Sequence, residues 1–174
     1  MIQIQNGRLH LNWLGQGEYP RYVSLRSEFD ALQAKLEEFL NEDSHATMRP
    51  NQWEVTYFNR LTQGDIWSDP GDWRKIFRGG FPTTVSSQDF IPEAVSLKHG
   101  FEIAPRKGRL HVEINYRPPA ADQKGEMIFT LTARGPVNDE ISLSQGLDIG
   151  HEAIVNGFTE LTSEEAHKQW ERNP

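Results

Sequence analysis

Two histidines occupy the same place in a short motif that occurs twice in the chain. NGRLHLNWL (residues 6–14) contains His10, and KGRLHVEINY (residues 107–116) contains His111. In each segment the histidine alternates with apolar residues, so it lies on the opposite face of the expected strand from them. If the two strands paired, the imidazoles could come together and bind a metal ion. The sequence places no third ligand, and two histidines on solvent-exposed strand faces are the simpler interpretation.

A second set of polar side chains lies in LDIGHEAIVNGF (residues 147–158), which has the pattern of a helix. Its polar face would carry Asp148, Glu152 and Asn156. His151 falls instead on the apolar face, where a histidine is usually a buried residue satisfied by one hydrogen bond. We therefore predict that His151 is a core residue. The segment lacks the second histidine, four residues after the first, that a zinc protease requires. Gly150, Ala153 and Gly157 form a small-residue flank that would let another backbone approach closely.

Three carboxylates and two indoles are concentrated in GDIWSDPGDW (residues 64–73). They are Asp65, Asp69, Asp72, Trp67 and Trp73. Carboxylates on a loop can bind Ca²⁺ or Mg²⁺, but the spacing and closing glutamate of an EF-hand are absent. Turn and helix-cap chemistry explains the aspartates equally well. Tryptophans on a loop can mark a contact surface, although burial against the first helix is the alternative that we favour.

Composition narrows the possible functions. The chain has no cysteine, which excludes disulfides, thiolate zinc sites and cysteine nucleophiles. It also lacks a glycine-rich phosphate loop and a nucleophile elbow, and we expect no cofactor. The 18 basic and 25 acidic side chains give a net charge of −7, which disfavours broad nucleic-acid binding. No apolar run has membrane-spanning length and no signal peptide is recognised, so we expect a soluble cytoplasmic protein.

The first 43 residues predict a hairpin followed by a long helix. Asn6-Gly7 is a strong signal for a two-residue turn, which would place Ile4 opposite Leu9 and Ile2 opposite Leu11. In EYPRYVSLRSEFDALQAKLEEFLNED (residues 18–43), apolar residues recur at steps of three and four, as on an amphipathic helix. They are Tyr22, Leu25, Phe29, Leu32, Leu36 and Phe39.

The rest of the chain predicts four strands and several helices. Alternating apolar residues mark strands at 53–61, 94–103, 109–117 and 126–134, and the last three read as an antiparallel meander. A short helix is expected within 68–80, with Ser68 or Asp69 as its cap. Two helices close the chain, and Thr162 with Glu165 fits a capping box for the last one.

These elements predict an α+β fold. We expect a mostly antiparallel sheet of about six strands, packed by the long N-terminal helix and the C-terminal helices. The chain would form a single domain over 1–174, with possible halves at 1–80 and 94–174. The repeated Gly-Arg-Leu-His raises the possibility of a duplicated β-β-α unit, while chance similarity between two strands is the alternative.

Several segments resemble a sporadically distributed family of uncharacterised bacterial proteins. LNWLGQGEYPRYVSLRSEF, WEVTYFNRL and LDIGHEAIVNGFTELTSEEAHKQWER carry the resemblance. The matching residues are Trp13, Tyr19, Pro20, Tyr57, Asn59, Leu147, Asp148, His151, Phe158, Leu161, Thr162, His167 and Trp170. The resemblance covers most of the chain except 79–94, and the family implies no catalytic residues because it has no assigned activity. Its members usually carry a further segment before the strand that matches Ile2 to Ile4, so we expect a shorter version or a neighbouring polypeptide that supplies the segment.

Three functions are compatible with these patterns. The first is a non-enzymatic protein-interaction subunit or regulator in a bacterial system of the toxin-control or phage-defence type, acting as a homodimer or with another protein. Its candidate partner-binding residues are Ile2, Ile4, Trp67, Trp73 and Phe77. The second is a ligand-binding domain with an apolar pocket beside Trp13, Trp53 and Tyr116. The third is a metal-dependent hydrolase that uses His10, His111 and nearby acids.

Overall fold

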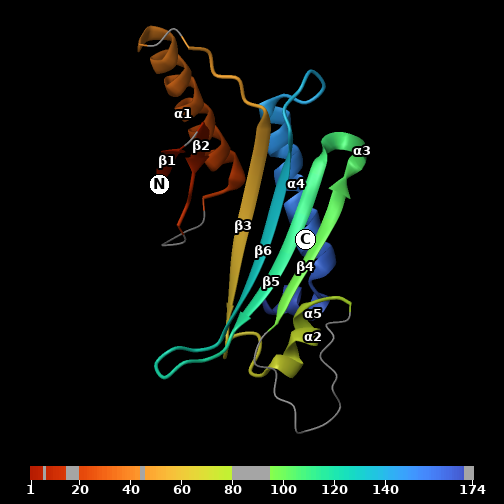
Figure 1. Ribbon diagram of the computed structural model, residues 1–174. Helices are drawn as coiled ribbons and strands as arrows, with labels where there is room; N and C mark the ends of the chain where they lie inside the picture. The colour runs from red at the N-terminus through yellow and green to blue at the C-terminus, as the bar shows by residue number, and fades with distance from the viewer. Residues whose placement is uncertain (6, 15–19, 44–45, 80–94, 171–174) are drawn as a thin grey trace. The chain divides into compact units, whose positions relative to one another are not determined.

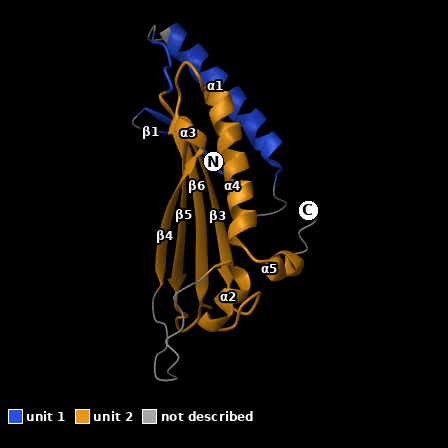
Figure 2. Ribbon diagram, turned by 90° about the vertical axis from the view of Figure 1, so that its right-hand side faces the viewer, with its two compact units in different colours: residues 1–50 blue, residues 51–174 orange. Residues whose placement is uncertain are grey.

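A computed structural model describes residues 1–5, 7–14, 20–43, 46–79 and 95–170 of the chain. These residues belong to two compact units, 1–50 and 51–174 (Figure 2). The division falls at residue 50, so the predicted halves 1–80 and 94–174 do not coincide with the units. None of the helices in the described ranges combines the length with the apolar composition that a membrane crossing requires.

The first unit contains a hairpin and one long helix. Strands β1 (Ile2–Gln5) and β2 (Arg8–Leu11) pair antiparallel, with Ile2 opposite Leu11 and Ile4 opposite Leu9. This register was predicted from Asn6-Gly7 and is confirmed, and Gly7 has the positive φ of 74° that a tight turn needs. Asn6 itself lies outside the described residues.

Helix α1 (Tyr22–Asp43) confirms the predicted amphipathic helix. Five of the six predicted apolar stripe residues are half-buried, and only Phe39 is exposed. Side-chain contacts one turn apart, Arg26 with Asp30 and Gln33 with Glu37, lie along the helix. The helix follows the hairpin, so the expectation of an N-terminal helix is wrong.

The second unit is built on a four-stranded antiparallel sheet (Figure 1). Its strands are β3 (Gln52–Thr62), β4 (Ser96–Ile103), β5 (Gly108–Arg117) and β6 (Glu126–Pro136), in the order β3-β6-β5-β4. A one-turn segment, α3 (Ala104–Lys107), joins β4 to β5. The α+β class is therefore confirmed, whereas the single sheet of about six strands is not, because the six strands form two separate sheets.

Helices cover one face of this sheet. Helix α4 (Leu143–Leu161) packs against β3 and β6 and lies behind the sheet in Figure 1, and Figure 2 shows it to one side of the strands. Three short helices lie at the end of the sheet farther from the β4–β5 turn. They are η1 (Pro70–Asp72), α2 (Trp73–Ile76) and α5 (Glu164–Gln169). One sheet face is thus covered by helices of the second unit, and among the described residues of this unit no helix covers the other face.

The core of the second unit lies between the sheet and α4, around the indole of Trp53. Gly146 and Gly150 of α4 approach this ring so closely that a Cβ at either position would overlap it, and a Cβ at Gly150 would lie 2.7 Å from Trp53 Cζ3. Gly135 of β6 is equally close, with 2.6 Å from its Cβ position to Trp53 Cζ2. Small residues therefore let helix and sheet enclose one large side chain. Of the predicted small-residue flank, Gly150 contacts this ring, and what approaches it is a side chain, where a backbone was predicted.

Capping in the closing helices differs from the prediction by one residue. The N-cap of α5 is Ser163, whose Oγ accepts a hydrogen bond from the Ala166 amide at 3.0 Å. Thr162, which was predicted as the cap, is fully buried and forms the C-cap of α4. Its Oγ1 lies 2.6 Å from Nε2 of His167. Ser163 and not Thr162 caps α5, because the Ser163 hydroxyl faces the first turn of this helix and the Thr162 side chain is buried.

The repeated Gly-Arg-Leu-His segments occupy different environments. The first forms β2 of the two-stranded hairpin, and the second forms β5 inside the four-stranded sheet. β2 pairs with β1 alone, while β5 pairs with β4 and β6. The strands of His10 and His111 therefore do not pair with each other in the described residues, so the arrangement under which the two imidazoles could bind a metal ion together is not found.

Candidate functional site

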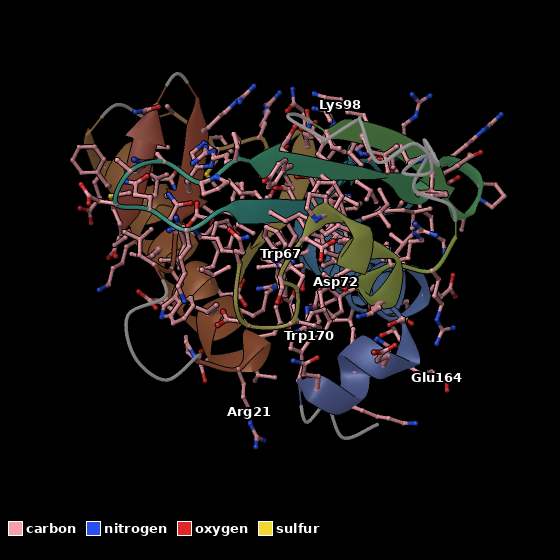
Figure 3. All side chains as sticks on the ribbon, turned by 90° about the horizontal axis from the view of Figure 1, so that it is seen from below. Arg21, Trp67, Asp72, Lys98, Glu164 and Trp170 are labelled. Carbon is pink, nitrogen blue, oxygen red and sulfur yellow. The ribbon has the colours of Figure 1, made fainter. Side chains whose placement is uncertain are left out.

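The face of the four-stranded sheet that α4 does not cover is the candidate site. We call it the open face, and it carries the even-numbered residues of β3, β4 and β6 and the odd-numbered residues of β5. Figure 3 shows Lys98 on this side of the sheet and Trp67 and Trp170 on the other. Along each strand the side chains point alternately to the two faces of the sheet. The buried core residues therefore lie on one face, and polar side chains with a few apolar ones lie on the other.

A shallow hollow of about 640 Å³ lies on the open face. Its floor includes three threonines, and Thr56 Oγ1 donates to Thr132 Oγ1 across β3 and β6 at 3.1 Å. Ile128 and Phe58 add apolar surface, and Phe58 is 71% exposed. A large exposed aromatic on the polar side of a strand contributes nothing to this unit's core and is available for contact.

Charged pairs cross between neighbouring strands on the open face. Arg60 of β3 and Glu126 of β6 lie 2.5 Å apart, and Lys98 of β4 and Glu113 of β5 lie 3.2 Å apart. Such exposed pairs add little stability, typically about 0–1 kcal/mol. Their effect is to hold long side chains in defined positions beside the hollow.

Two arginines face each other at one end of the open face. Arg109 of β5 and Arg134 of β6 are direct cross-strand partners, flanked by Glu54 on β3 and Glu102 on β4. Both arginines are exposed. Among the described residues neither guanidinium lies within ion-pair distance of a carboxylate. His111, the next residue of β5 on this face, is half-buried, and its Nε2 has no hydrogen-bond partner among the residues that the structure describes.

A tyrosine–histidine pair lies on the opposite, helix-covered face. The Tyr57 hydroxyl and His151 Nδ1 share a hydrogen bond of 2.9 Å, and both side chains are half-buried. Burial lowers the pKa of His151 below its ordinary value of 6.5, and the nearby Asp148 and Glu152 oppose this shift. The imidazole is therefore neutral at pH 7. The predicted apolar placement of His151 is met in part, since it is half-buried and hydrogen-bonded.

Two of the three aspartates of 64–73, Asp69 and Asp72, act in helix capping. Asp72 Oδ2 accepts from the Ser68 amide at 2.9 Å, and its Oδ1 lies 2.7 Å from Lys75 Nζ. The hydrogen bond from Lys75, followed by that from Ser68, lowers the pKa of Asp72 to about 2. Asp69 caps η1 through the Gly71 amide. Within the ranges that the structure describes, no group of three or more histidine, aspartate or glutamate side chains is arranged to hold a metal ion.

The predicted partner-binding residues separate into two groups. Ile2 and Ile4 are exposed, at 50% and 62%, on β1. Trp67, Trp73 and Phe77 are buried, so they do not form a surface here and that part of the prediction is corrected. Trp67 and Trp73 pack edge-on against each other and against Tyr116, and Trp67 Nε1 donates to the Leu61 carbonyl at 3.0 Å. These aromatics are numerous because they close one end of the core.

The predicted apolar pocket also differs from what the structure contains. Trp53 is buried against glycines and Tyr116 packs on two tryptophans, so the space beside both rings is filled. The hollow lies on the other face of the sheet. Its aromatic, Phe58, was not singled out from the sequence, although it breaks the alternation of WEVTYFNRL by standing out of phase with Trp53, Val55 and Tyr57.

Comparison of the chain with protein-family models, with curated proteins and with solved structures finds no match. The resemblance to a family of uncharacterised bacterial proteins therefore stays a prediction, and we infer a function from the geometry of the open face.

Proposed function

We propose that this chain is a protein-interaction subunit and that the open face of its four-stranded sheet is the docking surface. The observation that carries the proposal is Phe58, which is 71% exposed beside the hollow. Interfaces concentrate their binding energy in a few anchors, often aromatic, surrounded by polar residues that exclude water. Phe58 and Ile128 supply the apolar centre, and the threonines and ion pairs supply the polar surround.

The size of the open face supports this role. Strands rise about 3.3 Å per residue and lie about 4.8 Å apart, so four strands of about ten residues cover roughly 600 Å². A standard protein interface buries about 800 Å² on each partner. The open face is therefore of the same order of size as the surface that one partner contributes to a standard interface.

Site-specific photo-crosslinking tests the proposal. A photoreactive amino acid at Thr130, which pairs with Phe58 across β6 and β3, is expected to capture a defined partner in extracts of the source organism. The same amino acid at Glu164, an exposed position on α5, serves as the control and should not capture it. The captured protein is then purified and its affinity for the chain is measured directly.

Substitution of Phe58 sharpens the test. Phe58→Glu is expected to weaken binding of that purified partner roughly tenfold or more, as loss of an aromatic anchor does. Phe101→Glu is the matched control, because Phe101 is also exposed, at 45%, on the same sheet but on the other face. Equal effects of the two substitutions, or capture only from position 164, would contradict the proposal.

The biological setting is a separate matter from the surface. A setting of the toxin-control or phage-defence type stays part of the proposal, and it rests on the missing motifs, the acidic net charge and the sporadic distribution of the family that the chain resembles. The partner, whether a different protein or a second copy of this chain, is identified by the crosslinked product.

A further inference from the structure

We infer that the end of the open face nearest the β4–β5 turn recognises an acidic segment of the partner protein. Arg109 and Arg134 lie on this face, and Arg106 and Lys107 lie in the adjoining α3 turn; we call these four residues the basic cluster. The inference rests on the proposed docking role of the open face and specifies the chemistry of the partner. It is tested separately, with a probe that does not depend on Phe58.

The cross-strand arginines are the first observation. Directly opposed residues on antiparallel strands have Cβ atoms about 5 Å apart, and like charges in such pairs are unfavourable for folding. Arg109 and Arg134 form such a pair, and both are exposed. Neither is engaged in an ion pair within the described residues. A bound anion would remove this repulsion, and two guanidinium groups offer paired donors that match a carboxylate.

The turn that carries the other two cations is the second observation. Ala104 (φ 43°) and Arg106 (φ 64°) are the two non-glycine residues with positive φ in the described ranges, and both lie in α3. A glycine would adopt these angles at lower cost. Non-glycine residues in this conformation often occur where function maintains them. A role of its positive charge in binding would explain why an arginine, and not a glycine, occupies position 106.

Close backbone packing brings the two elements together. A Cβ on Gly108 would lie 2.6 Å from the Arg134 carbonyl oxygen, and a Cβ on Gly135 would overlap the Lys107 carbonyl. The turn therefore lies directly beside the end of β6. In the sequence, Lys107 and Arg109 flank Gly108, and Arg134 precedes Gly135.

The charge balance at this end favours an anionic partner. Glu54 and Glu102 flank the arginines, and Glu102 also accepts a hydrogen bond from the Arg106 amide at 3.2 Å. Four basic and two acidic side chains leave a local charge of +2, on a chain whose net charge is −7. A basic site on an otherwise acidic protein favours a partner whose negative charge is confined to the surface that contacts this site.

A short acidic protein segment fits better than a nucleic acid. The phosphates of a nucleic acid continue along its length, whereas beyond the basic cluster the open face carries cross-strand ion pairs, Arg60 with Glu126 and Lys98 with Glu113, in place of a continuous run of cations. The phosphates would also meet a predominantly acidic chain. A few carboxylates on a peptide can contact the cluster without extending into that repulsion.

Fluorescence anisotropy with a labelled oligoglutamate peptide tests the inference on the full chain. The Arg109→Gln/Arg134→Gln variant is expected to bind the peptide roughly tenfold more weakly than the wild type at low ionic strength. The matched control is Arg74→Gln/Lys168→Gln, which removes the same charge from exposed positions on α2 and α5, outside the open face. It is expected to change binding by less than about twofold.

Three results would overturn the inference. They are equal losses in both double variants, no loss in either, and tighter binding of a charge-matched oligothymidylate that also depends on Arg109 and Arg134. In another outcome, the peptide binds independently of Arg109 and Arg134 while crosslinking at Thr130 still captures a partner whose binding needs Phe58. This result would support the docking role of the open face and contradict only the recognition of an acidic segment. If the peptide binds as expected but no partner is captured, the docking role falls.

Arg106→Gly separates a binding role from a structural one. Glycine suits the positive φ at this position, so the melting temperature is expected to stay equal or rise. Affinity for the oligoglutamate peptide is expected to fall severalfold because one of the four cations is lost. A variant that melts higher and binds the peptide as well as the wild type would remove Arg106 from the cluster.

Discussion

At the scale of single residues, the hydrogen bond between Tyr57 and His151 ties the sheet to helix α4 through a neutral imidazole. Protonation of His151 would place a charge in a half-buried position, which is why burial lowers its pKa. The nearby Asp148 and Glu152 favour the charged form but do not outweigh this effect. The contact therefore depends on pH.

We expect His151 to make the protein less stable in mild acid. In the unfolded chain the pKa of a histidine is about 6.5, and in the folded chain that of His151 is lower. The unfolded state binds more protons between these two values, so the free energy of unfolding falls as pH drops below about 6.5. Urea unfolding of wild type and His151→Gln over this range measures the difference.

In His151→Gln this component of the pH dependence should disappear, while other titrating groups keep theirs. His99→Gln, at an exposed position of β4, is the control and should leave the pH profile as in the wild type. A His151→Gln profile parallel to that of the wild type would show that protonation of His151 is not linked to folding.

At the scale of elements, the second unit depends on how closely α4 approaches the sheet. Trp53 fills the space between them, and Gly146 and Gly150 leave room for its indole. Trp53 Nε1 is buried and has no hydrogen-bond partner in the described residues. Shape, rather than polar pairing, therefore holds this ring in place.

A methyl group at Gly146 is expected to destabilise the protein. The Cβ of Gly146→Ala would overlap the Trp53 ring, and overpacking of this kind costs about 1–3 kcal/mol in the free energy of unfolding. Chemical denaturation measures the loss. Gly100→Ala is the control, because a Cβ there meets nothing within 4 Å, and it should be close to neutral.

A second substitution checks the cause. Trp53→Phe removes part of the ring that the new methyl would meet, so the added cost of Gly146→Ala should be smaller in that background. Equal costs of Gly146→Ala with Trp and with Phe at position 53 would point to the helix backbone instead of this contact.

At the scale of the whole molecule, the chain is two units with separate sheets. The unit 51–174 has its own sheet, its own covering helices and a contiguous buried core. Folding units with a core of this kind unfold cooperatively. The hairpin and α1 of residues 1–50 form the other unit.

We therefore expect residues 51–174, expressed alone, to fold. Circular dichroism should retain strand and helix signals, and urea unfolding should follow a single transition. The oligoglutamate peptide should still bind, because every residue of the basic cluster belongs to this unit. A broad, non-cooperative transition would show that residues 1–50 are required for the fold of the second unit.

Local patterns in the sequence were enough to predict most elements. Apolar alternation marked β3 to β6 and a step of three and four marked α1, because each periodicity follows from backbone geometry alone. Asn6-Gly7 determined the register of β1 and β2, since a two-residue turn permits only one alignment. Asp69 as the cap of the short η1 segment was also recognisable, because a cap depends on its nearest neighbours.

Tertiary structure alone decided the rest. Strand order places β6 between β3 and β5 and leaves the hairpin as a separate sheet, which depends on long-range packing. Tertiary packing also determines that Trp67, Trp73 and Phe77 are buried and that Phe58 is exposed. The sequence does not distinguish these aromatic residues from one another. The fold also brought Arg109 and Arg134 together across two strands. The open face follows from such pairings, because only the fold determines which side of a strand the helices cover.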